Sequence, residues 1–125
     1  MSSISAKSFG VCNWFPEHGN HLVFDADLVT FAALRPAGKV FQYVGVEGMW
    51  RIVRYGTNTY RVSPDILKPV TAPLFEVGQP VATKDKAGVV ADVTWHFKEM
   101  APIYFVEFLG KRSSRRYSEA ELVPA

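Results

Sequence analysis

Apolar and polar residues alternate with a period of two along most of the chain, which is typical of half-buried β-strands. Residues 38–56, GKVFQYVGVEGMWRIVRYG, contain two such runs, and Glu47-Gly48 between them predicts a two-residue hairpin turn. NTYRVS predicts a short third strand after this hairpin. The second half predicts further strands at QPVATK, GVVADVTWHF, PIYFVEFLG and SRRYS. The pattern therefore predicts an all-β fold.

One short helix is predicted as an insertion in the first half, at about residues 25–35. Asp25 or Asp27 can cap its start, and Pro36 and Gly38 stop it. Its apolar face would be formed by Leu28, Phe31 and Leu34.

Two short helical turns are predicted near the ends of the halves. In RVSPDIL, Ser63 is an N-cap, Pro64 occupies the first helical position and Leu67 turns inward. In SEAEL, Ser118 and Glu121 have the spacing of a capping box.

The second half repeats the order of the first. WRIVRYG at 50–56 corresponds to YFVEFLG at 104–110, and RVSPDIL at 61–67 corresponds to RYSEAEL at 116–122. GKV at 38–40 corresponds in the same way to GVV at 88–90. The alternative is two unrelated β-meanders that use the same turn chemistry.

This repeat predicts two units and a short linker. The first unit would span residues 1–68, the linker 69–75 and the second unit 76–125. The linker contains two prolines, which disfavour a regular central strand. Leu74 and Phe75 at its end are available for burial.

The stretch FEVGQPVATKDKAGVVADVTW resembles the opening of small SH3-like barrels of the KOW and Tudor kind, and RYSEAEL resembles the 3₁₀ turn that ends them. The resemblance covers the last 50 residues or so, and residues 38–67 more loosely. It implies two tandem small SH3-like β-barrels, the first carrying the short helix. Tudor barrels hold methylated cations in an aromatic cage. Alternation places most of the available rings in the core, which disfavours a cage here; they are Trp95, Phe97, Tyr104 and Tyr117.

The whole chain also resembles small uncharacterised bacterial proteins that carry WFPEHG near the start and a WHFKE, YF, GK, RY, EL succession at the end. Some proteins with this kind of ending look like immunity proteins beside toxin genes. This resemblance implies a role in binding and neutralising another protein.

Composition, charge and cysteine content add a few further predictions. The 125 residues are 48% hydrophobic, enough for a core, and the formal charge of +2 is smaller than nucleic-acid-binding proteins usually carry. The start MSSISAKSFG lacks a signal-peptide pattern, and no apolar run has membrane-spanning length. A single cysteine fits a reducing compartment. We therefore expect a cytoplasmic protein without membrane contact.

Strict alternation sorts the strand at 88–97 into two faces. It predicts one face towards the core, made of Val89, Ala91, Val93, Trp95 and Phe97. The opposite face would carry Val90, Asp92, Thr94, His96 and Lys98. In the next strand Tyr104, Val106 and Phe108 would face the core, while Phe105 would face outward, as a contact surface or against the other half.

GKRSSRRYS is the one dense basic cluster, with cations at Lys111, Arg112, Arg115 and Arg116. Three interpretations are open. The hairpin could contact phosphates, with Tyr117 or Trp95 stacking on a base. It could dock on an acidic protein surface. It could be a solvated turn whose charge prevents aggregation.

CNWFPEHGNH places Cys12, His18 and His21 close in sequence. A zinc site would need a further ligand, Glu17 or His96, and a cysteine nucleophile would need an orienting acid. A nuclease using either histidine with Arg61 is a further alternative. The segment is interpreted instead as a turn, anchored by Trp14 and Phe15 and lying before the repeated strands.

The sequence thus predicts a non-enzymatic protein with no cofactor and no metal, which covers or recruits one protein partner. The expected contacts are Trp14, Glu17, His18, His96, Phe105, Lys111, Arg112, Arg115, Arg116 and Tyr117. The alternative function is a nucleic-acid-binding module that uses the hairpin at 111–117. The partner and the oligomeric state are not predicted.

Overall fold

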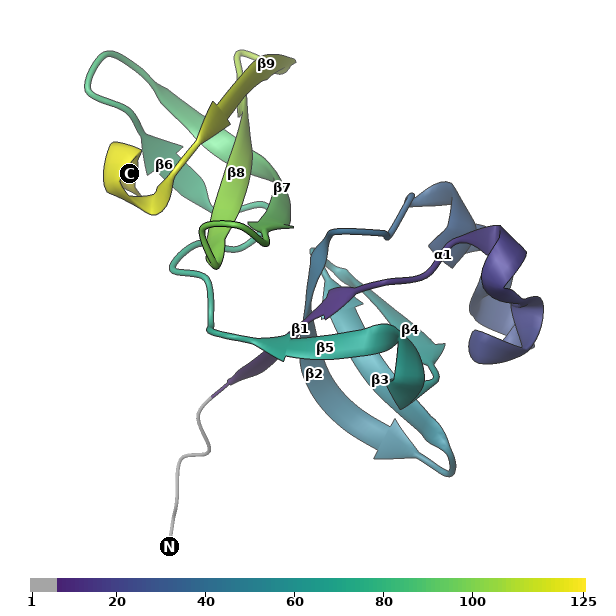
Figure 1. Ribbon diagram of the computed structural model, residues 1–125. Coiled ribbons are helices and arrows are strands. Elements are labelled where there is room, and N and C mark those ends of the chain that lie inside the picture. Colours follow the sequence, from purple (N-terminus) through teal and green to yellow (C-terminus); the bar gives the residue numbers. More distant parts are fainter. Residues whose placement is uncertain (1–6) are drawn as a thin grey trace, which may run out of the picture. The chain divides into compact units, whose positions relative to one another are not determined.

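Two five-stranded antiparallel sheets dominate the computed structural model, which describes residues 7–125 (Figure 1). The all-β class expected from the sequence is confirmed. The first sheet consists of β1 (Ser8–Cys12), β2 (Val40–Glu47), β3 (Trp50–Tyr55), β4 (Asn58–Val62) and β5 (Leu67–Val70). The second consists of β6 (Pro80–Ala82), β7 (Ala87–His96), β8 (Ala101–Phe108), β9 (Lys111–Tyr117) and β10 (Val123–Pro124).

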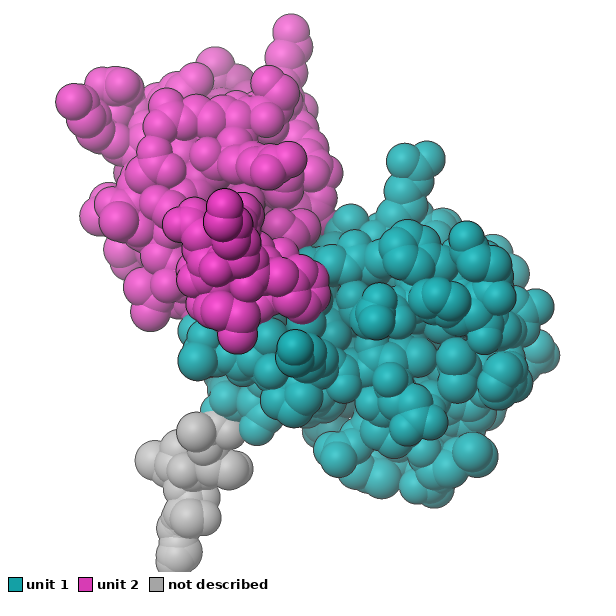
Figure 2. Space-filling view, viewed as in Figure 1, with its two compact units in different colours: residues 1–72 teal, residues 73–125 magenta. Residues whose placement is uncertain are grey.

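The chain divides into two compact units, residues 1–72 (unit 1) and 73–125 (unit 2), coloured separately in Figure 2. The strand order is β4-β3-β2-β1-β5 in unit 1 and β9-β8-β7-β6-β10 in unit 2. Each unit therefore has its first strand between its second and its last, and each sheet stays open between two edge strands. The similarity between the halves of the sequence extends to this order.

The repeated order begins earlier than the sequence suggested. β1 lies between β2 and β5, with Gly10 opposite Phe41 on one side and Pro69 on the other. We placed Cys12 before the repeated strands, but it is the last residue of β1. Alternation did not reveal β1 because its last four residues are all buried.

The segment that we expected to be a linker begins inside the first sheet. Lys68, Pro69 and Val70 belong to β5, which pairs only with β1 among the described strands. Pro69 is tolerated there because an edge strand does not need every main-chain N–H as a donor. Further along, Phe75 is buried against Tyr104, with 5.4 Å between the ring centroids, whereas Leu74 is exposed.

A β-bulge interrupts the second strand of each unit, at Val44 in β2 and at Ala91 in β7. The bulge in β7 changes the face on which the preceding residues lie. Val90 is therefore buried and Val89 is exposed, opposite to the prediction from strict alternation. Asp92 follows the bulge and pairs with Phe105, so it keeps its predicted face, where it is nevertheless buried. Phe97, also predicted to be in the core, is exposed. The predicted core residues of β8, Tyr104, Val106 and Phe108, are buried.

Local turn chemistry agrees with the sequence in most places. Ser63 Oγ accepts a hydrogen bond from Asp65 N at 3.2 Å, and Ser118 N donates to Glu121 Oε1 at 2.9 Å. These contacts begin the 3₁₀ turns η4 (Pro64–Ile66) and η5 (Glu119–Glu121). The buried residue of η4 is Ile66 rather than the predicted Leu67. The β2–β3 turn consists of Gly48 and Met49, one residue later than expected, because Glu47 pairs with Trp50.

The predicted insertion is longer and less helical than expected. It contains the 3₁₀ turns η1 (Pro16–His18), η2 (Asn20–Leu22) and η3 (Asp25–Asp27), followed by the six-residue helix α1 (Leu28–Ala33). Asp27 precedes α1, but its carboxylate does not cap the helix and binds Arg61 instead. Phe31 is the buried residue of α1 and packs on Trp14, Phe41 and Tyr60.

No helix within residues 7–125 has the length and apolar character that crossing a membrane requires.

Candidate functional site

Two of the four cations in the basic hairpin are neutralised within the protein. Arg112 forms an ion pair with Asp92, the one buried charged residue among residues 7–125, and Arg115 forms one with Glu121. For Lys111 and Arg116, which are exposed, the described residues provide no such carboxylate. The hairpin therefore offers fewer cations to a ligand than its sequence suggests.

The aromatic residues beside the hairpin are covered by these arginines. The Arg112 guanidinium lies 4.7 Å from the centroid of the Phe105 ring, and that of Arg115 lies 4.8 Å from the centroid of Tyr117. Phe105 is half-buried and Tyr117 is buried. Tyr117 has almost no surface with which to contact a partner, and its exposed side already carries a cation.

The residues of CNWFPEHGNH mostly satisfy one another. Trp14 is 1% exposed, and its Nε1 donates to the Gly19 carbonyl at 3.1 Å, so the ring is part of the core of unit 1. His18 Nδ1 accepts a hydrogen bond from Phe15 N at 3.2 Å. Glu17 lies exposed on η1. Trp14 has almost no surface for a partner, whereas Glu17 and His18 remain accessible.

Cys12 lies in a setting that keeps its thiol protonated. Burial raises the pKa of Cys12 to about 12, despite a hydrogen bond from the main chain of Trp14. Because the thiolate is the reactive form, this cysteine is a poor nucleophile in the folded protein. Within residues 7–125 no three His, Cys, Asp or Glu side chains gather as a metal site would require.

His96, expected on the outer face of β7, is half-buried. Its Nδ1 accepts a hydrogen bond from Glu99 N at 3.1 Å and so fixes the β7–β8 turn.

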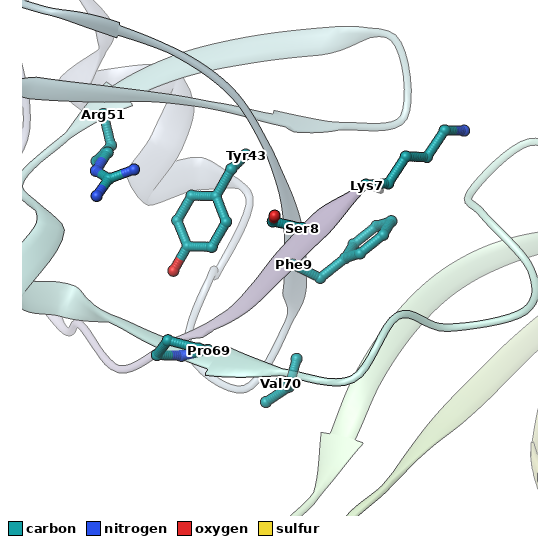
Figure 3. Close-up of a pocket in the computed structure, with 7 residues that line it drawn as sticks. All are labelled: Lys7, Ser8, Phe9, Tyr43, Arg51, Pro69 and Val70. Atoms are coloured by element: carbon teal, nitrogen blue, oxygen red, sulfur yellow. The ribbon is translucent and has the colours of Figure 1, made fainter. Parts of the chain in front are cut away.

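A groove on unit 1 brings together residues from four strands, β1, β2, β3 and β5 (Figure 3). Its volume is about 470 Å³, and it is lined by Lys7, Ser8, Phe9, Tyr43, Arg51, Pro69 and Val70. In Figure 3 the Tyr43 ring points from β2 across β1 towards Pro69 on β5, so that it forms the floor of the groove.

Gly10 makes this position of Tyr43 possible. A Cβ atom at residue 10 would lie 2.9 Å from Tyr43 Cζ and closer still to the hydroxyl. Any larger residue would therefore push the ring away from β1, because real Cβ atoms do not approach other atoms this closely. The glycine is required by the close approach of a side chain, not by a turn.

Positive charge lies beside the apolar floor. The Arg51 guanidinium is 5.4 Å from the centroid of the Tyr43 ring, and Lys7 lines the opposite end (Figure 3). Partial burial raises the pKa of Tyr43, which the nearby Arg51 charge lowers only in part. None of the residues that line the groove is a carboxylate. The groove thus combines rings and aliphatic side chains with cations, a lining suited to an acidic, partly apolar ligand.

Sequence reasoning missed this groove. Its residues lie far apart in the chain and meet only because β5 returns to pair with β1. The one available signal was the glycine in SFGVC, which marks a close approach when it stands inside a strand. That signal requires the strand to be recognised first.

Arg61, considered above as a partner of a catalytic histidine, is held by two carboxylates. Its Nε lies 3.0 Å from Asp27 Oδ2, and its Nη1 lies 3.3 Å from Glu47 Oε2. Asp27 Oδ2 also accepts a hydrogen bond from Arg61 N at 2.8 Å. Partial burial favours the neutral acid, but the hydrogen bonds and charge of Arg61 outweigh it and hold the pKa of Asp27 below its usual value. This arrangement attaches the insertion to β4.

Residues 1–123 match a protein family described as a family of unknown function (DUF6960). Neither the curated proteins nor the solved structures provide a match.

Proposed function

Since the chain belongs to DUF6960, a family without an assigned function, we propose from the geometry alone that it is a non-catalytic binding protein. It binds one partner protein, and the groove on unit 1 receives an extended acidic segment of that partner. The observation that carries this proposal is the lining of the groove, which joins a tyrosine floor to Arg51 and Lys7 without a carboxylate.

An extended peptide fits this lining because its side chains alternate in direction. Apolar side chains of the peptide would lie on Tyr43, Pro69 and Val70, and its carboxylates would lie beside Arg51 and Lys7. Rings and arginines are the residue types that most often dominate the affinity of a protein interface. A partner bound here would be covered over the contacted segment, which is the occlusion expected of an immunity-type protein in the bacterial cytoplasm.

We also propose that both units are SH3-like. The support is the strand order that they share, together with a 3₁₀ turn directly before the last strand of each: η4 before β5, and η5 close before β10. A rigid sheet of this kind holds the groove residues at fixed distances, so that the partner and not the scaffold bears the ordering cost on binding.

Nucleic acid is the less suitable ligand. Phosphate binding depends on several cations acting together, and the hairpin at 111–117 has two of its four arginines and lysines engaged with Asp92 and Glu121. The experiment on function therefore also measures binding to nucleic acid.

The test is affinity capture from the native host with three baits: the wild type, Arg51→Glu, and Lys98→Glu as a control that reverses an exposed charge outside the groove. We expect one protein to be retained by the wild type and by Lys98→Glu, and to be lost with Arg51→Glu. Fluorescence anisotropy with a single-stranded DNA 20-mer at low salt is measured in parallel.

Two outcomes would refute the proposal. One is capture that Arg51→Glu leaves unchanged, which would place the contact elsewhere. The other is DNA binding that falls steeply with salt and is relieved by Lys111→Ala with Arg116→Ala, which would identify the hairpin as a phosphate site.

A further inference from the structure

The two units differ most in the connection between their first and second strands. In unit 1 this connection is residues 13–39, with three 3₁₀ turns and α1, whereas in unit 2 it is the short turn at residues 83–86. The remaining strands follow the same order in both units. Unit 1 therefore shows what an additional segment does when it is placed on this scaffold.

The long connection adds to the outer edge of β4. Val23 forms a β-bridge with Val62, and Phe24 N donates to the Arg61 carbonyl at 2.9 Å. Ser63 N donates in turn to the Leu22 carbonyl at 2.8 Å. Residues 22–24 thus act as a short extra strand beside an edge of the sheet.

Side chains reinforce this edge contact. The Asp27 carboxylate accepts hydrogen bonds from the main chain and the guanidinium of Arg61, and that guanidinium lies 3.9 Å from the centroid of the Phe24 ring. The Arg61 guanidinium is thus held by the Phe24 ring and by the carboxylate of Asp27, three residues further along the chain. On the other face of β4, Phe31 packs on Tyr60 at 5.3 Å between centroids.

Unit 2 has the corresponding edge without the additional segment. β9 is an edge strand, and Arg116-Tyr117-Ser118 occupies the place that Arg61-Val62-Ser63 has in unit 1. Arg116 is exposed, and no described carboxylate forms an ion pair with it. Between the turn at 83–86, β9 and η5 lies a groove of about 570 Å³, and its lining includes Lys86, Ser113, Arg115, Tyr117 and Glu121.

We propose that the β9 edge, on the face of Arg116 and not in this groove, binds an extended segment of a partner protein in the way that residues 22–27 bind to β4. The segment pairs with the main chain of β9, places a ring beside the Arg116 guanidinium, and carries a carboxylate three residues later that pairs with Arg116. An extended segment that joins a sheet edge gains affinity from main-chain hydrogen bonds and specificity from its side chains. This surface lies on unit 2 and does not depend on the groove over Gly10.

The details of the edge limit the register of the segment. Ser118 N donates to Glu121 Oε1 at 2.9 Å, so it is not available in the way that Ser63 N is available to Leu22. Main-chain pairing between the bound segment and β9 therefore begins at Arg116 and not at Ser118.

The experiment uses a fluorescein-labelled peptide of the chain's own sequence, HLVFDAD (residues 21–27), added to the full-length protein. We expect fluorescence anisotropy to show saturable binding with a Kd below about 1 mM, the range of a weak peptide contact. We expect Arg116→Glu to weaken it at least tenfold, while the charge-matched control Lys98→Glu leaves it unchanged. A peptide with Asn in place of the last Asp should lose affinity to a similar degree.

Amide chemical shifts locate the bound peptide and show whether each variant remains folded. Shifts at β9 and η5 support the proposal. Shifts confined to β4, with binding lost in Arg61→Glu but not in Arg116→Glu, would mean that the peptide only replaces the chain's own segment, and the proposal fails. It also fails if no binding is seen at about 1 mM peptide. Binding that Arg51→Glu weakens and Arg116→Glu leaves unchanged would place the peptide in the groove on unit 1, and the proposal for β9 would fail while the proposed function stands.

Discussion

Units 1 and 2 have the same strand order but complete their sheets differently. In unit 1, residues 22–24 of the connection at 13–39 lie along β4, and the same connection supplies Trp14 and Phe31 to the core. In unit 2 the turn at 83–86 leaves β9 uncovered. The difference shows that the connection, not the strands, decides which edge of the sheet remains accessible. Arg61 is covered by the chain's own segment in unit 1, whereas Arg116, at the corresponding position of unit 2, is exposed.

Phe31→Ala should give the largest effect of the changes considered, because it removes the ring by which the insertion enters the core. Phe31 is fully buried against Trp14, Phe41 and Tyr60. We expect the free energy of unfolding of unit 1 to fall by about 3–5 kcal/mol. Labelling of Cys12, buried in this unit, by a thiol reagent measures this loss through the population of the open form, under conditions where reclosing is faster than labelling.

Val29→Ala is the matched control, since Val29 is on the same helix and 79% exposed. It should change stability by less than about 0.5 kcal/mol. If Phe31→Ala accelerated labelling no more than Val29→Ala, the insertion would not be part of the core of unit 1, and the comparison would lose its basis.

Tyr104→Phe tests the hydrogen bonds that connect the start of unit 2 with its last turn. The buried Tyr104 hydroxyl donates to Glu119 Oε2 at 2.6 Å and accepts from Leu74 N at 3.0 Å, so it joins η5 to the start of the unit. We expect a loss of about 1 kcal/mol, since the variant removes the hydrogen bonds of the hydroxyl while Leu74 N keeps its bond to Glu119 Oε2 at 2.7 Å. Hydrogen exchange of the β7 and β8 amides measures it. Protection unchanged from the wild type would show that the network is dispensable.

Asp27→Asn tests the ion pair that attaches the insertion to β4. Arg61 holds the pKa of Asp27 below its usual value, so the carboxylate stabilises the fold above the pKa of the unfolded chain. This stabilisation disappears as the pH falls through the lower, folded pKa. At pH 7 we expect Asp27→Asn to lower the unfolding free energy by about 1 kcal/mol.

The pH dependence identifies the cause. The stability difference between wild type and Asp27→Asn should begin to narrow below about pH 4, where the unfolded wild-type chain takes up the Asp27 proton, and it should disappear only below the lower, folded pKa. Urea unfolding between pH 3 and pH 7 measures it. A difference that is constant over this range would indicate a steric effect rather than a charge.

Ser63→Ala and Ser118→Ala should give the smallest effects and the closest comparison between units. The Ser63 hydroxyl accepts from Asp65 N, whereas at Ser118 the main-chain N–H, which alanine retains, makes the shorter bond to Glu121. We expect about 1 kcal/mol for Ser63→Ala and roughly half of that for Ser118→Ala. Paired hydrogen-exchange measurements check the order, and a reversed order would contradict the assignment of the two caps.

The sequence predicted several strands and turns from local patterns, but it did not predict how the strands pair. The strands at β7 and β8 follow from alternation, and the turns at Ser63 and Ser118 follow from the side chains themselves. The bulge at Ala91 has no local signal, yet it exchanges the positions of Val89 and Val90 between surface and core. Such a shift depends on the partner strand, which a single sequence does not specify.

The same limit applies to the candidate sites. Four cations within residues 111–116 suggested a basic surface, but Arg112 forms an ion pair with Asp92 on β7, and Arg115 forms one with Glu121 on η5. In contrast, Arg51 and Tyr43, which attract no attention in the sequence, share a groove because the sheet places β2 beside β3. Charged residues that are neighbours in the sequence therefore need not form a charged surface in the folded protein.

The long connection between β1 and β2 also has a consequence for the route by which the chain folds. Closing a loop has an entropic cost that rises by about 0.6 kcal/mol for each doubling of its length, so pairing β1 with β2 across residues 13–39 costs on the order of 1–2 kcal/mol more than pairing β6 with β7. We therefore expect the half of the chain that the ribosome makes last to form its ladder first. Until β1 is enclosed, Cys12 is an ordinary reactive thiol, so its protection from a thiol reagent should report when β1 joins the sheet of unit 1.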